Sequence, residues 1–528
     1  MTPEPTTTVW GTSIVPVVVH GREFRMYADR PRNLGSLLPF ADRWSERAHI
    51  VQGERVMTFA QFHRAVRARA SELRARGVTT GDRVVILGWN SPEWIVNFWA
   101  TVSAGGVAVL ANAWWSEKEL ADSLDTVAPA LVIADDRVVD RVASQWELLP
   151  WDPQSETDSE TQLEATVDDI DENAPATIIF TSGTSGRPKA AVLSHRSLLA
   201  GLQMLLHITR RLPHQVDEST GQPALHTGPM FHVGGVQTLL RAICVGDTLV
   251  MPAGRFDPVE AMRLIEQWRV QRWSAVPTMV SRVLEHPDVR TRNLTTLRSL
   301  TVGGAPMTPE FVERIRTGLS GVEPRIATGY GLTENGGQGV AASGADTVER
   351  PGTTGRALPC VEIMIAPATE FTDGEILLRS PTQMLGYLGE NEAPIDSDGW
   401  LHTGDLGRLD DDGYLFITGR SKEMIIRGGE NIAPAAVEAA LTALPDVADA
   451  VVFGMPHPDL DEEVMAAVVL THNVDPDTLA GQLRGRIASF AIPSRWVPHR
   501  EPFPVNHAGK IDKKAVVAAA RQLLEEVR

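Results

Sequence analysis

Residues 181–189 have the side chains that a phosphate-binding loop needs, since they read Thr-Ser-Gly-Thr-Ser-Gly-Arg-Pro-Lys. An apolar run at 176–180 precedes them and indicates a buried strand, and a helical pattern begins after Ser194. Backbone N–H groups and hydroxyls on a glycine-rich turn are donors suited to a polyphosphate. The stretch is not a Walker A loop, because no Gly-Lys-Ser/Thr closes it. Taken alone it could be a glycine-rich surface turn.

A second motif, Gly-Tyr-Gly-Leu-Thr-Glu at 329–334, places an aromatic ring between two glycines and follows it with a hydroxyl and a carboxylate. Glycines let the backbone approach a flat ligand on which Tyr330 could stack. A carboxylate such as Glu334, close to phosphates, can bind Mg²⁺ through oxygen. By itself the motif is weak, because Gly-Tyr-Gly is usually only a turn.

Four further stretches carry single residues of possible function, and each also has a simpler structural explanation. Asp405 ends Gly-Trp-Leu-His-Thr-Gly-Asp, where an aspartate often caps a turn, and Lys510 lies in Val-Asn-His-Ala-Gly-Lys-Ile, although most lysines are solvated. His232 lies in Pro-Met-Phe-His-Val-Gly-Gly, although a lone histidine is more often a core residue. The fourth stretch, 301–306, reads Thr-Val-Gly-Gly-Ala-Pro.

Together these six motifs, in the order in which they follow one another from Thr181 to Lys510, resemble those of the adenylate-forming superfamily, which includes acyl-CoA synthetases, luciferases and the adenylation domains of peptide synthetases. The resemblance covers nearly the whole chain. It implies an acid–thiol ligase that uses ATP and Mg²⁺ to convert a carboxylic acid into an acyl-adenylate. The acyl group then passes to CoA, with AMP and pyrophosphate as the other products.

The resemblance also implies roles for individual residues of the nucleotide site. Tyr330 would stack on adenine, Thr333 would contact phosphate, and Thr184 and Glu334 would hold the metal. Asp405 would accept hydrogen bonds from both ribose hydroxyls, and Arg420 would contact the same ribose. The full set expected to bind ATP or CoA is Thr181, Ser182, Gly183, Ser185, Gly186, Lys189, Gly303, Gly304, Ala305, Gly329, Tyr330, Gly331, Thr333, Asp405, Ile417, Arg420, Gly428 and Gly429.

Lys510 resembles the family's adenylation lysine, which bridges the carboxylate and the α-phosphate, where an ammonium stabilises developing charge. Lys422 would be the hinge about which a small domain rotates between the two half-reactions. The residues expected to act in catalysis are Lys510, Glu334, Thr184 and His232. The acid pocket is expected to contain His232, Val233, Gly234, Val302, Gly303, Gly336 and Gly337.

The acceptor and the acid stay open at this point. The pocket string has no acidic residue to hold an α-ammonium, so we expect a fatty, aryl or cyclic acid without one. No carrier domain follows Lys510, which favours free CoA, but an amide synthetase that uses an amine acceptor is an alternative. A non-catalytic nucleotide-binding protein is a more remote one, because Lys510, Glu334, Asp405 and Lys422 are all present.

Composition narrows the class of partner. The 528 residues carry 49 Lys plus Arg against 67 Asp plus Glu, a net charge of −18, which disfavours nucleic acid or an anionic membrane. Two cysteines in apolar surroundings, and no evident signal peptide, predict a cytoplasmic protein. The oligomeric state is open, with a homodimer one option. Residues 94–115 lack charge, yet their sequence pattern indicates a helix, a turn and a strand, so we expect no membrane span.

The alternation of helical and apolar strand patterns predicts an α/β fold of mostly parallel, doubly covered sheets, with a β-rich subdomain from about 361 to 417. A chain of this length should have two or more domains. We place the large adenylate-forming domain at 1–421 and a small, mobile α+β domain at 422–528. Residues 1 to about 40 are expected to be an irregular lead-in, and an acidic loop is expected within 152–173.

Overall fold

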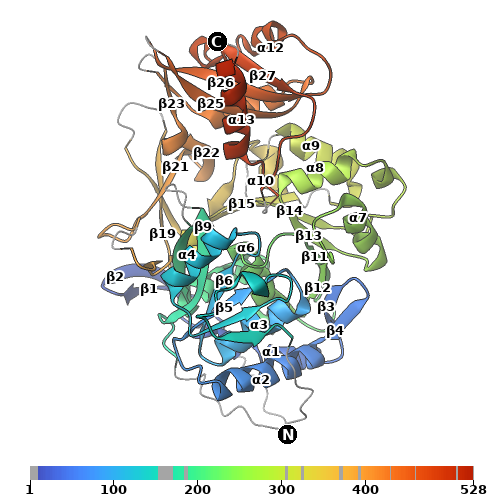
Figure 1. The fold of residues 1–528 in the computed structure, drawn as a ribbon, viewed down its shortest axis with the longest axis vertical. Coiled ribbons are helices and arrows are strands. Elements are labelled where there is room, and N and C mark those ends of the chain that lie inside the picture. The colour runs from blue at the N-terminus through green and yellow to red at the C-terminus, as the bar shows by residue number, and fades with distance from the viewer. Residues whose placement is uncertain are drawn as a thin grey trace.

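The computed structural model describes residues 10–152, 170–182, 188–303, 307, 309–322, 326–367, 373–390, 394–427, 430–457, 460–506 and 509–526. Figure 1 shows a large body that contains the N-terminus and, above it, a smaller body that ends the chain. The large body contains two extended sheets, and the small body contains a third. The mixed α/β architecture predicted from the sequence is confirmed.

The first sheet of the large body has seven strands within the described residues, in the order β20-β10-β9-β6-β5-β7-β8. Strands β5 to β9 pair in parallel, and β10 and β20 add antiparallel at one edge. The bounds are β5 (Arg83–Leu87), β6 (Val107–Ala111), β7 (Leu131–Ala134), β8 (Leu148–Pro150), β9 (Pro175–Ser182), β10 (Pro188–Ser194) and β20 (Gly386–Tyr387).

Both faces of this sheet are apolar because its parallel strands are covered on both sides. Val84 and Ile86 of β5 pack with the helices α2 and α3, whereas Val85 and Leu87 pack with α4 on the other face. Helix α3 begins after the N-cap Ser91 and is buried almost throughout. The helices that accompany the sheet are α1 (Phe40–Trp44), α2 (Phe59–Ala75), α3 (Pro92–Ser103), α4 (Glu117–Val127) and α5 (His195–Ile208).

In the described part of the chain the second sheet is a continuous surface of 13 strands, in the order β18-β19-β21-β22-β17-β16-β15-β14-β13-β11-β12-β3-β4. The run β3-β12-β11-β13-β14-β15 is parallel, and the strands from β16 to β18 are antiparallel, as the β-rich pattern predicts. The bounds of the parallel part and its edge are β3 (Ala48–Gln52), β4 (Arg55–Thr58), β11 (Pro223–His226), β12 (Thr248–Met251), β13 (Arg272–Ala275), β14 (Ser299–Val302) and β15 (Ile326–Tyr330).

The antiparallel part of the second sheet reaches toward the small body. Its strands are β16 (Val340–Ala342), β17 (Gly355–Ala357), β18 (Glu362–Ile365), β19 (Gly374–Arg379), β21 (Leu401–Leu409) and β22 (Tyr414–Arg420). One face of the parallel part is covered by α7, α8 and α9, through a core that includes Trp273 and Leu300. The helices are α6 (Val233–Val245), α7 (Pro258–Gln267), α8 (Pro277–Glu285), α9 (Pro309–Gly318) and α10 (Gly344–Glu349).

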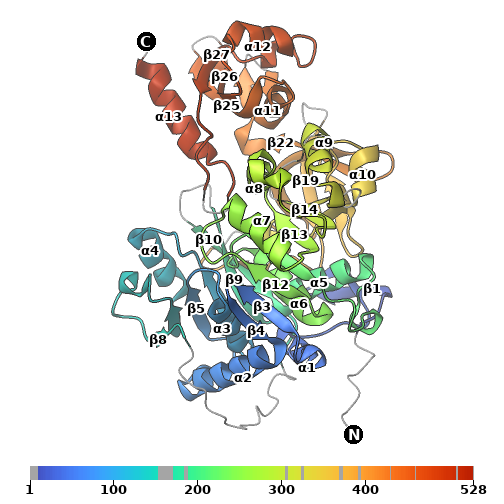
Figure 2. The same ribbon diagram turned by 90° about the vertical axis from the view of Figure 1, so that its right-hand side faces the viewer.

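The small body is a five-stranded sheet with helices on both faces. Helices α11 and α12 pack on one face and α13 on the other, where Figure 2 shows it standing apart from them. The elements are β23 (Ile425–Arg427), β24 (Glu430–Ile432), α11 (Pro434–Thr442), β25 (Val447–His457), β26 (Asp461–Leu470), α12 (Pro476–Leu483), β27 (Arg495–His499) and α13 (Lys513–Glu526).

The structure corrects two expectations about local structure. The lead-in contains a hairpin, β1 (Ile14–Val19) and β2 (Arg22–Tyr27), closed by His20 and Gly21, both at positive φ. After the phosphate loop the chain forms β10 before α5 begins, so the loop joins two antiparallel strands and not a strand and a helix. The acidic loop falls largely in 153–169, outside the described residues.

The uncharged stretch 94–115 forms the rest of α3, a turn and β6, as predicted. Gly105 turns the chain at a φ of +92°, a conformation that glycine adopts without steric cost. Within the part of the chain that the structure describes, no helix is both long enough and apolar enough to cross a membrane.

Candidate active site

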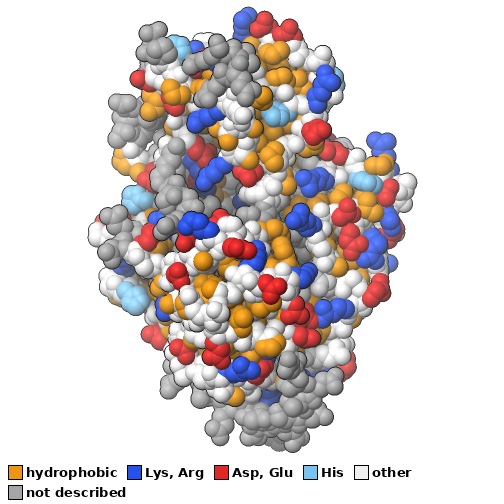
Figure 3. Space-filling model, in the orientation of Figure 1, with side chains coloured by type: hydrophobic (Ala, Val, Ile, Leu, Met, Phe, Trp, Pro, Cys, Tyr) orange, Lys and Arg blue, Asp and Glu red, His pale blue; other side chains and the backbone are white. Residues whose placement is uncertain are grey.

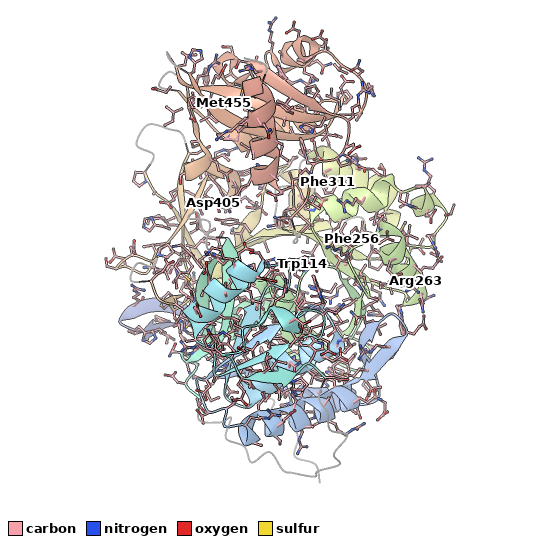
Figure 4. The ribbon with its side chains drawn as sticks, in the orientation of Figure 1. Trp114, Phe256, Arg263, Phe311, Asp405 and Met455 are labelled. Carbon is pink, nitrogen blue, oxygen red and sulfur yellow. The ribbon has the colours of Figure 1, made fainter. Side chains whose placement is uncertain are left out.

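A cleft of about 3530 Å³ opens between the small body and the second sheet, and it brings most of the predicted site residues together. Asp405 is labelled at this junction in Figure 4. On the face shown in Figure 3, acidic and basic side chains are interspersed, without a large patch of one sign. The predicted residues that line the cleft are Thr181, Lys189, His232, Val233, Gly234, Gly303, Gly329, Tyr330, Gly331, Thr333, Glu334, Gly337, Asp405, Ile417, Arg420 and Lys510.

Tyr330, Asp405 and Arg420 form one hydrogen-bonded unit on three strands. The Tyr330 hydroxyl donates to Asp405 Oδ2 at 2.7 Å, and Arg420 Nε lies 2.9 Å from Asp405 Oδ1. Asp405 on β21 and Arg420 on β22 are cross-strand partners, so the sheet register sets this ion pair. Burial, with the neighbouring charge of Asp405, raises the pKa of Tyr330 above its usual value, which keeps its ring neutral. The unit offers a flat ring beside a fixed carboxylate.

Glu334 lies beside a second unit that joins β10, which follows the phosphate loop, to its edge partner β20. Tyr387 on β20 donates its hydroxyl to Glu334 Oε1 at 2.6 Å. Lys189 on β10 lies 4.7 Å above the Tyr387 ring, and its Nζ is 2.6 Å from Glu390 Oε2. Burial, and then the charge of Glu334, raises the pKa of Tyr387. Tyr387 therefore acts as a donor that orients the Glu334 carboxylate.

Lys510 is presented by a tight turn from the small body. The Gly509 N–H donates to the Asn506 carbonyl at 2.9 Å, and the Lys510 N–H donates to Asn506 Oδ1 at 3.1 Å. The turn rests on α8 of the large body, where the Thr278 hydroxyl donates to the Gly509 carbonyl. Burial, and then the positive charge of Arg420, lowers the pKa of Lys510. Lys510 therefore lies in the cleft, close enough to Arg420, the partner of Asp405, for the two positive charges to interact.

Substituting Gly509 by alanine is expected to loosen this contact with α8. Gly509 has a φ of +78°, and a Cβ there would meet the Met279 methyl at 2.8 Å. A displacement of about 1 Å in a positioning element can cost on the order of 10²-fold in rate. We expect Gly509→Ala to slow acyl-adenylate formation by about that factor and to leave thioester formation from supplied acyl-adenylate near wild type. Alanine at Gly485, where no atom lies within 4 Å and φ is +80°, controls for backbone strain alone.

Asp449 of β25 introduces a pH-dependent element into the cleft wall. It lies near Glu285 of α8 and Arg314 of α9, which form an ion pair of 2.9 Å. Burial, and then the charge of Glu285, raises the pKa of Asp449 to about 6. A carboxyl whose folded pKa is raised contributes stability that is present below its unfolded pKa and is lost as the pH rises through about 6.

The melting temperature should therefore depend on pH through Asp449. We expect the wild type to lose part of its stability between about pH 5 and about pH 7, and Asp449→Asn to lose less over the same interval. Thermal unfolding followed by differential scanning calorimetry measures both curves. Parallel curves for the two proteins would contradict this role of Asp449.

The predicted acid pocket lies at the start of α6. His232 is the N-cap residue of that helix, and its ring centroid lies 4.7 Å from that of Phe231, which in turn meets Trp114 edge to face at 5.6 Å. A Cβ on Gly234 or Gly303 would meet no atom within 4 Å, so both glycines face open space. The pocket is thus bounded by aromatic rings on one side and open at its glycines.

Two predicted pocket residues are not brought to the cleft. Val302 packs with Leu300 in the core beneath α7, α8 and α9, because alternate residues of a strand point to opposite faces. Gly336 is enclosed by backbone, since a Cβ there would lie 2.9 Å from the Thr382 carbonyl oxygen. Gly337 does reach the cleft, but a Cβ on it would meet Val233 at 2.8 Å, so these two residues pack closely.

Several predicted residues lie outside the described part of the chain: Gly183, Thr184, Ser185, Gly186, Gly304, Ala305, Gly428 and Gly429. For Ser182 and Lys422 only the backbone is described, Lys422 within a 3-10 turn at Ser421–Glu423. Two contributors to the site carried no sequence signal. Tyr387 stands far from the Glu334 motif in sequence, and Thr278 is an ordinary residue of the first turn of α8.

The oxygen donors of the cleft determine whether it can hold Mg²⁺. Within the described residues, no three His, Cys, Asp or Glu side chains gather as a metal-binding cluster. Glu334 offers a carboxylate beside β10 and β20, whereas the nearby carboxylate of Glu390 is paired with Lys189. One or two carboxylates together with substrate phosphates are the usual ligands of Mg²⁺. The donor set therefore fits a Mg²⁺ ion that is held mainly by a bound nucleotide.

Known proteins that this chain resembles are also nucleotide-binding enzymes. The model of the family AMP-binding enzyme matches residues 39–388, and that of the AMP-binding enzyme C-terminal domain matches residues 436–510. A feruloyl-CoA synthase from Amycolatopsis sp is 33% identical over 92% of this chain and 99% of its own length. A 3-[(3aS,4S,7aS)-7a-methyl-1,5-dioxo-octahydro-1H-inden-4-yl]propanoyl:CoA ligase from Mycobacterium tuberculosis is 34% identical over 88% and 94%.

A solved structure of an amide bond synthetase, McbA from Marinactinospora thermotolerans, superposes with a TM-score of 0.80 at 26% identity, over 92% of this chain and 99% of its own. The two family models, taken with the relatives, span the large body and the turn that carries Lys510. The chain therefore belongs to the AMP-binding enzyme family of adenylate-forming enzymes, within its acid–thiol ligases.

Proposed function

We propose that this ligase activates a bulky carboxylic acid, with a ring or a bent chain and no α-amino group, and transfers the acyl group to CoA. The observation that carries the proposal is the position of Lys510, which lies in the same cleft as Tyr330, Asp405 and Glu334 while the acid pocket opens beside them. Such an arrangement suits the first half-reaction, in which the acid carboxylate attacks the α-phosphorus of ATP and pyrophosphate leaves.

In this half-reaction each unit of the cleft has a separate task. Tyr330 offers its ring to adenine, and Asp405 accepts hydrogen bonds from the ribose while Arg420 balances its charge. Lys510 places its ammonium between the acid carboxylate and the α-phosphate, where negative charge develops in the transition state. Thr181 and Lys189 line the part of the cleft that the β- and γ-phosphates would occupy.

Glu334, oriented by Tyr387, and Thr184 are the residues that would hold Mg²⁺. When bound, the ion neutralises phosphate charge and favours the departure of pyrophosphate. Lys189 is paired with Glu390 in the structure, so a bound phosphate would compete with that carboxylate for the ammonium.

For the second half-reaction we propose that the small domain, residues 422–528, rotates about Lys422. The rotation withdraws Lys510 and carries Gly428 and Gly429 to the path of the CoA thiol. The rotation would break the hydrogen bond of Thr278 to Gly509 and separate Asp449 from Glu285 and Arg314. A hinge at an element end is a common way for one cleft to serve two reactions.

The acid class rests on the lining of the pocket. His232, Val233 and Gly234 provide no carboxylate for an α-ammonium, and the space at Gly234 and Gly303 leaves room beside the aromatic rings. The names of the two CoA-ligase relatives indicate that each acts on a ring-containing acid. Both cysteines are buried and unbonded, which favours a reducing compartment, and we propose the cytoplasm.

A panel of acids tests the function directly. Benzoates, cinnamates, bicyclic acids and fatty acids are each supplied with Mg·ATP and with CoA, with an amine mixture, or with neither, and pyrophosphate and products are measured. We expect thioester only with CoA. Amide formed from an amine, with no thioester from CoA, would instead assign the chain to the amide synthetases. The absence of pyrophosphate with every acid would reject the proposed function.

A further inference from the structure

The cleft continues from the adenylation site along one face of the second sheet. On β13 and β14, Trp273 and Leu300 point into the core, so Ser274 and Thr301 point to the other face. Both Ser274 and Thr301 are exposed although they lie in the middle of a sheet, and both line the cleft. An open channel therefore runs over the sheet from Gly303, at the carboxyl ends of the strands, toward their amino ends.

Helices α5 and α6 provide lining residues from outside the sheet for this channel. Leu205 and Ile208 come from α5, and Thr238 comes from α6. The first part of the channel is therefore lined by small, hydroxyl and apolar side chains.

At the end of the channel near the amino end of β13, charge is concentrated on arginines. Arg272, the first residue of β13, and Arg241 of α6 both contact Asp247 Oδ2, at 2.6 and 2.5 Å. Arg211 lines the same part of the cleft and donates to the Thr220 carbonyl at 3.1 Å. Asp247 is buried, and its other oxygen accepts the Gln222 N–H at 3.0 Å. Arg241 and Arg272 thus share one carboxylate, which leaves one positive charge in excess among these three residues, and Arg211 lies close enough for its charge to act on Asp247.

Holding Asp247 does not by itself account for this arrangement. One arginine would neutralise one buried carboxylate, whereas each further arginine adds a desolvation cost and a repulsion. Burial lowers the pKa of Arg272 to about 9, and the charge of Arg241 adds to the effect. The Arg272 Nε–H is also buried without a hydrogen-bond partner in the described part of the chain. A buried donor of this kind is costly unless something pairs with it.

We propose that the acid substrate carries a second carboxylate at its far end, which binds to Arg241, Arg272 and Arg211. This inference rests on the proposed function, because it names the acid of the same pocket. Arginine is the residue suited to a carboxylate, since its planar donors can bind both oxygens. When the arginines bind the far carboxylate, the other carboxylate lies at Lys510. Only that end of the substrate is then activated.

The strand register sets the length of such an acid. Ala275 pairs with Val302 next to the adenylation site, and Arg272 pairs with Ser299 at the arginine end. Three residues of strand span about 10 Å, at about 3.3 Å per residue. An aliphatic acid as long as sebacate or a two-ring acid fits this separation, whereas malonate is too short.

Matched pairs of acids test the inference: sebacate against decanoate, and biphenyldicarboxylate against biphenylcarboxylate. For each, kcat/KM is measured from pyrophosphate release with Mg·ATP and CoA. We expect the dicarboxylate of at least one pair to exceed its monocarboxylate by about 10-fold or more, as a charge-assisted pair is worth about 1.5–3 kcal/mol. Arg211→Gln and Arg241→Gln should each remove most of this preference, measured as the ratio of the two kcat/KM values on the same variant.

Two controls separate binding from folding. Arg263→Gln removes an arginine of α7, labelled in Figure 4 away from the channel, and should keep the preference. Arg272→Lys keeps a charge beside Asp247 but loses the planar donors, so it should weaken the preference while the melting temperature stays near that of the wild type. Monocarboxylates that react as well as their dicarboxylates would overturn the inference and leave the proposed function standing. No pyrophosphate from any acid, including the cinnamates and fatty acids, would overturn both.

Discussion

Replacing Lys510 by alanine is expected to slow acyl-adenylate formation by about 10³-fold, since a positioned cation in phosphoryl transfer is worth about 10³–10⁵. The ammonium lies in the cleft with Tyr330 and Asp405, and the turn that carries it is fixed by Asn506 and Thr278. We propose that it acts in the first half-reaction only, so thioester formation from supplied acyl-adenylate should stay within a few-fold of wild type. Pyrophosphate release and thioester appearance, measured separately, give the two rates.

Lys118→Ala is the control, because Lys118 is an exposed residue of α4 that pairs with Asp122 and is not itself a lining residue of the cleft, although its neighbour Glu119 is. It should not alter either rate. Equal losses in both half-reactions for Lys510→Ala would contradict the division of labour between the two conformations. A fall in melting temperature is not expected, because an ammonium with a lowered pKa is held at an energetic cost in the free enzyme.

Replacing Asp405 by alanine is expected to reduce kcat/KM for ATP by about 10²-fold or more, because hydrogen bonds to a charged group are worth about 1.5–3 kcal/mol each. Asp405 does two things at once: it would accept the ribose hydroxyls, and it fixes the Tyr330 hydroxyl and Arg420. Without it, Arg420 loses its partner near the ammonium of Lys510. The loss should appear mainly in KM for ATP, since the interaction is made in the ground state as well.

A second variant distinguishes the direct contact from the indirect one. Tyr330→Phe removes the hydroxyl that donates to Asp405 but keeps the ring and the carboxylate, so it should cost only a few-fold in KM for ATP. If Tyr330→Phe were as damaging as Asp405→Ala, the carboxylate would act by holding the tyrosine and not by binding the ribose. Steady-state kinetics at saturating acid and CoA measure both variants.

The parts of the fold that the sequence predicted well are those where periodicity is strong. Val84, Val85 and Ile86 form a short apolar run that only a doubly covered parallel strand explains, and β5 lies where the run lies. The hairpin of β1 and β2 was missed because its turn, His20-Gly21, lacks the usual Asn-Gly or Asp-Gly signal. Strand β10 was missed because Pro188 and Lys189 looked like the end of a loop, whereas pairing with β9 extends the sheet through them.

In the candidate site, too, the sequence identified motifs but not the neighbours that the fold brings to them. Motif order identified Tyr330, Asp405 and Lys510, which the fold brings into one cleft from β15, β21 and the turn after β27. It assigned Val302 to the pocket because the stretch 301–306 resembles an acyl-pocket segment of the family, yet the alternation of strand side chains turns Val302 into the core. Tyr387 and the arginines around Asp247 could not be found from motifs, because their meaning depends on which distant strands and helices lie beside them.

The contact of Gly509 with α8 has a consequence for the order in which molecules enter and leave. While Thr278 holds the turn, Lys510 lines the cleft between the two bodies, and in the mechanism proposed above the lysine must withdraw before the thiol can enter. Pyrophosphate must then depart before the acceptor can react. Initial velocities plotted in double-reciprocal form should give parallel lines for ATP against CoA and intersecting lines for ATP against the acid, the signature of a ping-pong enzyme with a ternary first stage.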